Sequence, residues 1–206
     1  WISHFHLDHC GGLAPLLFSM KHAPETRSRS KPLRIFGPSR LRSLLDSFND
    51  ASDYRLFDQR FPIEIFEIES LETFSILDGV TAVPLKTPHT PESHAIHLRD
   101  SSGGTLAFTA DTGYDLEIAA FARRVDLLLI ECSFVRNKPV ERHLELVEAI
   151  DLIRRADPVR AVLTHLYPEW DKIVLKEVTA EYSTKAEIEL AYDGYTWRSQ
   201  KEAANS

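Results

Sequence analysis

Three histidines and one aspartate stand within six consecutive positions near the start of the chain. His4, His6, Asp8 and His9 belong to the string WISHFHLDHCGG. His4 and His6 are two residues apart, so on an extended segment their side chains point the same way. Imidazole and carboxylate groups are ligands of zinc and similar divalent ions. The string predicts part of a metal site, and two ions about 3.5–4 Å apart could activate a bridging water for hydrolysis.

Further ligand types follow three apolar runs downstream. His89 comes after VTAVPLK, Asp111 directly after TLAFTA, and His165 closes the run RAVLTH. Each lies at the C-terminal end of a predicted strand, where loops gather functional residues on a rigid scaffold. A chance histidine-rich surface loop is the alternative explanation of the first cluster. Four potential ligands within six residues disfavour it.

These residues resemble the metal ligands of the metallo-β-lactamase superfamily, and the resemblance covers the whole chain. The family's H-x-H-x-D-H motif and its later histidine, aspartate and histidine fall on seven residues: His4, His6, Asp8, His9, His89, Asp111 and His165. The resemblance implies an α/β fold of the αββα sandwich type. It also implies that His4, His6 and His89 hold one metal, that Asp8, His9 and His165 hold another, and that Asp111 bridges them. Asp8 is assigned a catalytic role as well.

The beginning of the chain departs from the family pattern. Members usually have several strands before the first motif, whereas this chain opens at Trp1 inside what reads as a strand. We therefore expect the N-terminal strands to be missing. A length of 206 residues predicts a single domain over 1–206.

The stretch VDLLLIECSF followed by ERHLE resembles the ribonuclease Z-like group of the superfamily. By that resemblance His143 is a catalytic histidine that helps the leaving group, and an acidic partner such as Glu131 orients it from outside the metal ligands. The alternative is an ordinary exposed residue at a helix start. Glu92, where glyoxalase-like members have glycine, favours the same group. The class II cyclic-nucleotide phosphodiesterases share the first motif.

The expected function is hydrolysis of a phosphodiester by a hydroxide that bridges two divalent ions, with zinc favoured and manganese or iron as alternatives. The alternative substrates are a lactone, a thioester or an amide. A di-iron redox protein is disfavoured because such members have glutamate where this chain has His6. A non-catalytic relative is disfavoured because no ligand is lost. Only 21 residues separate His89 from Asp111, which leaves no room for the substrate arm of tRNA-processing members.

The composition limits the classes of binding partner and the cellular compartment that we expect for this chain. A formal net charge of −7 disfavours broad attraction to nucleic acid, and no run approaches the roughly 18 apolar residues that span a bilayer. The expected partner is a small-molecule or phosphodiester substrate, and a homodimer is compatible with the sequence. Cys10 and Cys132 are expected in the core. So few cysteines favour a reducing, cytoplasmic location.

The elements that must position these residues are short strands in series and in alternation with helices. Apolar or alternating runs predict strands at 33–36, 63–68, 80–86, 94–98, 105–110, 126–132, 160–165 and 187–194. Helical periodicity predicts helices within 12–22, 39–48, 116–124, 144–156 and 173–183. This mixture predicts a sheet-rich α/β architecture with helices outside. His94 and His97 alternate on one predicted strand, where packing is the expected role.

Overall fold

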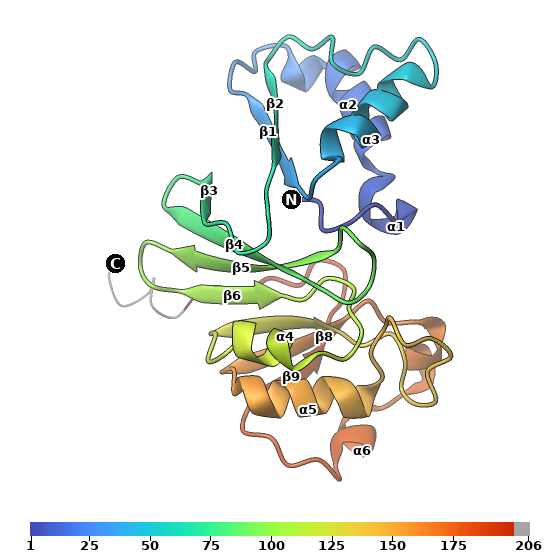
Figure 1. Cartoon of the computed structure of the whole chain (residues 1–206), viewed down its shortest axis with the longest axis vertical. Coiled ribbons are helices and arrows are strands. Elements are labelled where there is room, and N and C mark those ends of the chain that lie inside the picture. The colour runs from blue at the N-terminus through green and yellow to red at the C-terminus, as the bar shows by residue number, and fades with distance from the viewer. Residues whose placement is uncertain (200–206) are drawn as a thin grey trace. The chain divides into compact units, whose positions relative to one another are not determined.

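The computed structural model describes residues 1–199 and divides into two compact units, Trp1–Glu69 and Ser70–Ser206 (Figure 1). Each unit has its own hydrophobic core. The single domain that the length predicts stays a prediction. No helix among the described residues is long and apolar enough to cross a membrane.

The first unit joins a pair of parallel strands to short helices. Strands β1 (Leu33–Gly37) and β2 (Ile63–Glu67) pair in register from Leu33 opposite Ile63 to Gly37 opposite Glu67. The helices are α1 (Leu7–Cys10), α2 (Leu13–His22) and α3 (Leu41–Asp50), with the 3-10 turn η1 (Pro24–Thr26). Leu41 and Leu45, one turn apart on α3, are fully buried in a core with Leu17 and Ile35.

The second unit is built on a seven-stranded sheet in the order β3-β4-β5-β6-β7-β8-β9. Its strands are β3 (Phe74–Leu77), β4 (Val80–Lys86), β5 (His94–Asp100), β6 (Thr105–Phe108), β7 (Leu127–Glu131), β8 (Arg160–Thr164) and β9 (Glu187–Leu190). Neighbours are antiparallel from β3 to β6 and parallel from β6 to β9. Because parallel strands end at the same edge of a sheet, the loops after β6, β7 and β8 gather there.

The parallel strands are connected through helices, as this topology requires. The connections contain α4 (Leu116–Phe121), α5 (Leu146–Ala156), the 3-10 turn η2 (Pro168–Lys172) and α6 (Leu175–Thr179). Helix α5 buries Leu146, Ala149, Ile150 and Ile153, which share one helical face, in the core of this unit. It begins with a capping box between Glu145 and Glu148, and it runs beside α4 (Figure 1).

The α/β class is confirmed, and the strands predicted from 33–36 onward and the predicted helices are present among the described residues, most with shifted ends. The opening residues 1–6, which read as a strand, belong to no strand. Strand β3 was not predicted. The largest shift is in α6, which is much shorter than the predicted 173–183. Asp8 and His9 do not share the extended segment of His4 and His6, because Leu7–Cys10 forms one helical turn.

Candidate metal site

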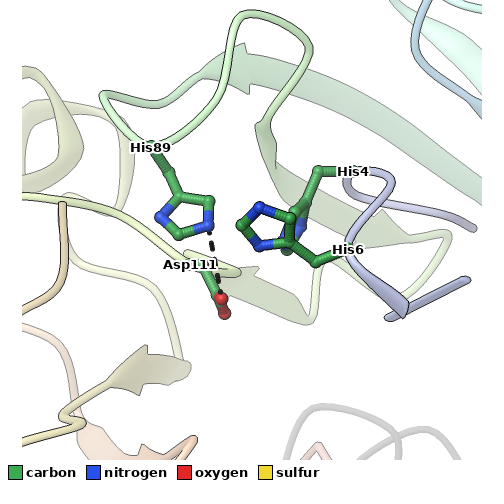
Figure 2. Close-up of side chains that lie close together, drawn as sticks. All are labelled: His4, His6, His89 and Asp111. Atoms are coloured by element: carbon green, nitrogen blue, oxygen red, sulfur yellow. Dashed lines mark ion pairs between the residues drawn. The ribbon is translucent and has the colours of Figure 1, made fainter. Parts of the chain in front are cut away.

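The first motif gathers its side chains within a few residues of backbone. His4 and His6 come from the extended segment before α1, and their ring centroids are 4.8 Å apart (Figure 2). The His9 ring lies 4.2 Å from that of His4, because the turn of α1 brings it back toward the segment. Asp8 Oδ2 lies 3.3 Å from His9 Nε2. The cluster predicted from the spacing is therefore formed inside the first unit.

A close contact explains the glycine that follows this turn. A Cβ atom on Gly11 would lie 2.5 Å from the carbonyl oxygen of Leu7. This distance is too short for any residue that has a side chain. The Gly11 backbone has φ −62°, so close approach and not a left-handed conformation requires glycine here. The amide groups of His9 and Cys10 both donate to the carbonyl of His6, at 2.9 and 3.0 Å. These contacts fix the turn that carries Asp8.

In the second unit three predicted ligands follow strand ends, and their side chains meet. His89 lies after β4, Asp111 after β6 and His165 directly after β8. Asp111 Oδ2 lies 3.6 Å from His89 Nε2, as the dashed line in Figure 2 marks, and 3.4 Å from His165 Nε2. His89 and Asp111 are both buried. The carboxylate thus faces two imidazole nitrogens, a donor set suited to a divalent ion.

The far side of each of these imidazoles is held by a protein oxygen. His89 Nδ1 lies 2.8 Å from the carbonyl oxygen of Arg142, and His165 Nδ1 lies 2.9 Å from Ser133 Oγ. A carbonyl oxygen only accepts, so Nδ1 of His89 donates to it, and Nε2 is left as the ring nitrogen that can bind a metal. Metal-binding histidines are oriented in this way. The residues of this unit therefore fit a divalent metal in both chemistry and orientation.

Glu131, at the end of β7, lies fully buried behind these residues. Its Oε1 accepts from the amide of Thr112 at 2.7 Å and from His143 Nδ1 at 3.0 Å. Its Oε2 accepts from Ser133 Oγ at 2.8 Å and from the amide of Leu144 at 3.2 Å. Four donors satisfy the buried carboxylate, and the predicted pair of Glu131 and His143 is in contact.

His143 also lies close to the predicted ligands of this unit. Its ring stacks on that of His165, with centroids 5.4 Å apart and 9° between the planes. Single donor atoms of Asp111, His143 and His165 lie within 4.8 Å of one another. His143 is therefore placed beside the candidate metal site. Its role as a catalytic acid stays a prediction, as do the roles of the other candidate residues.

Ser133 is a part of the site that sequence reasoning missed. Its hydroxyl donates to Glu131 Oε2 and accepts from His165 Nδ1, so it connects the buried carboxylate to a predicted ligand. Its Oγ also lies 3.3 Å from His143 Nδ1. The available signal was its position two residues after Glu131, which places both side chains on one side of an extended segment.

Lys138 is a second residue that sequence reasoning missed. Its Nζ lies 2.8 Å from Glu148 Oε1, 3.4 Å from Glu141 Oε2 and 3.1 Å from the carbonyl oxygen of His143. Burial opposes the charge on Lys138, but the hydrogen bond to Glu148 and the nearby carboxylates outweigh it and raise the pKa of the ammonium. Lys138 thus fixes the loop that carries His143.

The cysteines and the remaining strand histidines are packing residues, as expected. Cys10 and Cys132 are free and buried, and burial raises the pKa of both thiols. His94 is buried, with Nδ1 2.7 Å from the carbonyl of Glu92. His97 packs against Phe121, and burial lowers the pKa of its imidazole.

A family model described as the beta-lactamase superfamily domain matches residues 1–166. The chain belongs to the metallo-β-lactamase superfamily. The chain is 31% identical over 185 residues to an uncharacterized protein of Mycobacterium tuberculosis, and the aligned region covers 88% of this chain and 66% of that protein. It thus spans a little under two thirds of the length of this curated relative.

Two further relatives are named as a metallo-hydrolase and as a ribonuclease. The probable metallo-hydrolase YhfI of Bacillus subtilis is 24% identical over 198 residues, which cover 95% of this chain and 76% of that protein. Its crystal structure matches with a TM-score of 0.74 at 22% identity, covering 95% of this chain and 75% of that one. Ribonuclease Z 1 of Schizosaccharomyces pombe is 26% identical over 211 residues, covering 95% of this chain and 25% of that protein.

Membership of the metallo-β-lactamase superfamily confirms two coarse predictions from the sequence. The chain has the fold of metal-dependent hydrolases, and it carries histidine and aspartate groups of the kind that hold a metal. It shares the superfamily with ribonuclease Z-like members. The number of metal ions, their identity and the substrate stay predictions.

Proposed function

We propose that this chain is a phosphodiesterase of the ribonuclease Z-like group. The observation that carries the proposal is the hydrogen-bonded pair of His143 and Glu131 beside Asp111 and His165. A thioester releases a thiolate, which leaves without a proton donor, whereas a phosphodiester with an alkyl leaving group releases an alkoxide, which needs one. A histidine held for proton transfer at this place therefore favours the phosphodiester.

Two divalent ions, zinc in the first instance, are part of the proposal. By the family motif, one ion is assigned to His4, His6 and His89, the other to Asp8, His9 and His165, and Asp111 to both. The imidazole and carboxylate donors fit such ions, and the protein oxygens at Nδ1 of His89 and His165 support this use. When bound, the ions would neutralise phosphate charge and lower the pKa of a water molecule.

His143 is the proposed proton donor to the leaving oxygen. Its Nδ1 is engaged by Glu131, so Nε2 is the ring nitrogen available to substrate. The Glu131 carboxylate fixes the ring plane. Lys138 and the backbone contact from Leu144 to Glu131 hold the loop in place. A positioned acid of this kind contributes roughly 10²–10⁴-fold in rate.

The substrate proposed is not precursor tRNA. The interval between His89 and Asp111 is filled by β5 and β6, which pair as neighbours in the sheet. No separate arm stands in this interval, where tRNA-processing members carry theirs. A small phosphodiester substrate and a cytoplasmic location remain part of the proposal.

The test combines metal analysis with a panel of substrates. Protein purified without chelator is assayed for bound zinc, manganese and iron, and then for turnover of bis(p-nitrophenyl) phosphate, a lactone, a thioester and a cephalosporin. We expect about two metal equivalents and turnover of the phosphodiester. Turnover of the lactone or thioester without the phosphodiester would replace the proposal with its alternative. Metal content near zero after reconstitution would remove the metal chemistry altogether.

A further inference from the structure

A pocket of about 410 Å³ opens on the second unit at the C-terminal end of α5. Three segments line it: the residues after α4, the last turn of α5 with the residue that follows it, and the segment before β9. Figure 1 shows α4 and α5 side by side on this unit. The charged residues of the lining, called here the basic pocket, are Arg123, Arg124, Arg154, Arg155, Lys185 and Asp157.

The basic pocket concentrates positive charge on a chain whose formal net charge is −7. Five of its six charged residues are cationic. Arg155 is paired with Asp151, with Nε 2.6 Å from Oδ2. The side chains of Arg123, Arg124 and Lys185 form no hydrogen bond or ion pair with any residue in 1–199. Like charges that converge without partners repel one another, and a bound anion would relieve that repulsion.

The basic pocket is separate from the candidate metal site. Helix α5 has 11 residues and begins just after the loop that carries His143, whereas the pocket lies at its other end. At 1.5 Å per residue, the helix places about 15 Å between the two ends. The catalytic proposal therefore does not account for these cations.

The shape and the other lining atoms favour a small ligand. A volume of this size is in the range of pockets for small molecules, roughly 300–1,000 Å³. Its lining includes the buried Ile153, and the segment before β9 contributes Ser183 and Thr184. Single-stranded nucleic acid is instead tracked by an open basic groove with aromatic residues for base stacking. The described lining contains no aromatic residue.

We propose that the basic pocket binds a small ligand that carries two or more phosphate groups. Guanidinium groups match phosphate oxygens with paired hydrogen bonds, and Lys185 adds a point charge from a different segment. Several cations around one pocket suit a ligand with several phosphate charges better than a ligand with a single charge. This proposal is independent of the reaction at the metal site.

The experiment titrates inorganic tripolyphosphate into the full chain by calorimetry. Amide spectra of ¹⁵N-labelled protein then locate the binding, which should shift signals of Arg124 and of residues 183–186. The double variant Arg123→Gln with Lys185→Gln should weaken binding at least tenfold, because each substitution removes a charge-assisted contact. The matched control, Lys172→Gln with Lys176→Gln, removes the same charge from exposed positions outside the pocket and should bind as the wild type does.

Four results would overturn the proposal. The double variant could bind tripolyphosphate as tightly as the wild type, or the control could weaken binding by the same factor, which would indicate a net-charge effect only. The shifted amides could instead surround His89 and Asp111. A single-stranded RNA oligonucleotide that binds more tightly than tripolyphosphate and is lost in the same double variant would assign the pocket to RNA.

Discussion

Replacing Ser133 with alanine removes the hydroxyl that connects Glu131 to His165. The variant loses a hydrogen bond to a buried carboxylate and leaves Nδ1 of His165 without the oxygen that lies 2.9 Å away. Hydrogen bonds to charged groups are worth about 1.5–3 kcal/mol, so we expect the free energy of unfolding to fall by that amount. Loss of the group that orients a metal-binding histidine typically costs about 10–100-fold in metal affinity.

Chelator competition measures the zinc affinity of the Ser133→Ala variant, and denaturant unfolding measures its stability. Ser133→Thr keeps the hydroxyl and should restore most of the affinity. Thr105→Val is a matched control, because the Thr105 hydroxyl also donates to a carboxylate, Asp126, at 2.9 Å. We expect Thr105→Val to lose stability and to keep its zinc affinity. If Ser133→Ala binds zinc as tightly as the wild type, Ser133 only packs and the orientation argument is wrong.

Three further predictions concern individual residues. Asp111→Ala should lower both bound metal, by elemental analysis, and turnover severely, since its carboxylate faces two predicted ligands; full activity would refute that role. His143→Ala should keep its metal and lose about 10²–10⁴-fold in rate for an alkyl leaving group but little for p-nitrophenolate. Loss of metal would instead make His143 a ligand. Burial lowers the pKa of His97, so its contribution to stability is present above the unfolded pKa of 6.5 and falls away below it. His97→Gln should therefore lose less stability than the wild type between about pH 7.5 and pH 5.5 by denaturant unfolding; equal losses would contradict this.

Much of the fold follows from local pattern alone. Runs such as 80–86 and 160–165 are apolar because these strands are buried, and their periodicity places them within a residue or two of β4 and β8. Strand β3 was not predicted. Its four residues are partly exposed, and its pairing with β4 shifts register. The sequence therefore has no run of apolar residues that would indicate a strand there.

The candidate site was predictable where residue type carries the signal. His89, Asp111 and His165 are ligand types that follow apolar runs, and the fold of the second unit brings their side chains together. Ser133 and Lys138 carry no such signal, because a serine or lysine is common anywhere on a chain. Their contacts depend on how the loop after β7 folds back over Glu131, which spacing in the sequence does not encode.

The contacts of Glu131 tie three loops to one point. The carboxylate binds the backbone of Thr112, next to Asp111, the backbone of Leu144, next to His143, and through Ser133 the side chain of His165. Each loop is thus pinned near a point where it joins a strand or a helix, by a contact that does not depend on the residues at its tip. Tips of this kind can diverge during evolution and alter which molecules enter, while the reacting groups stay in register.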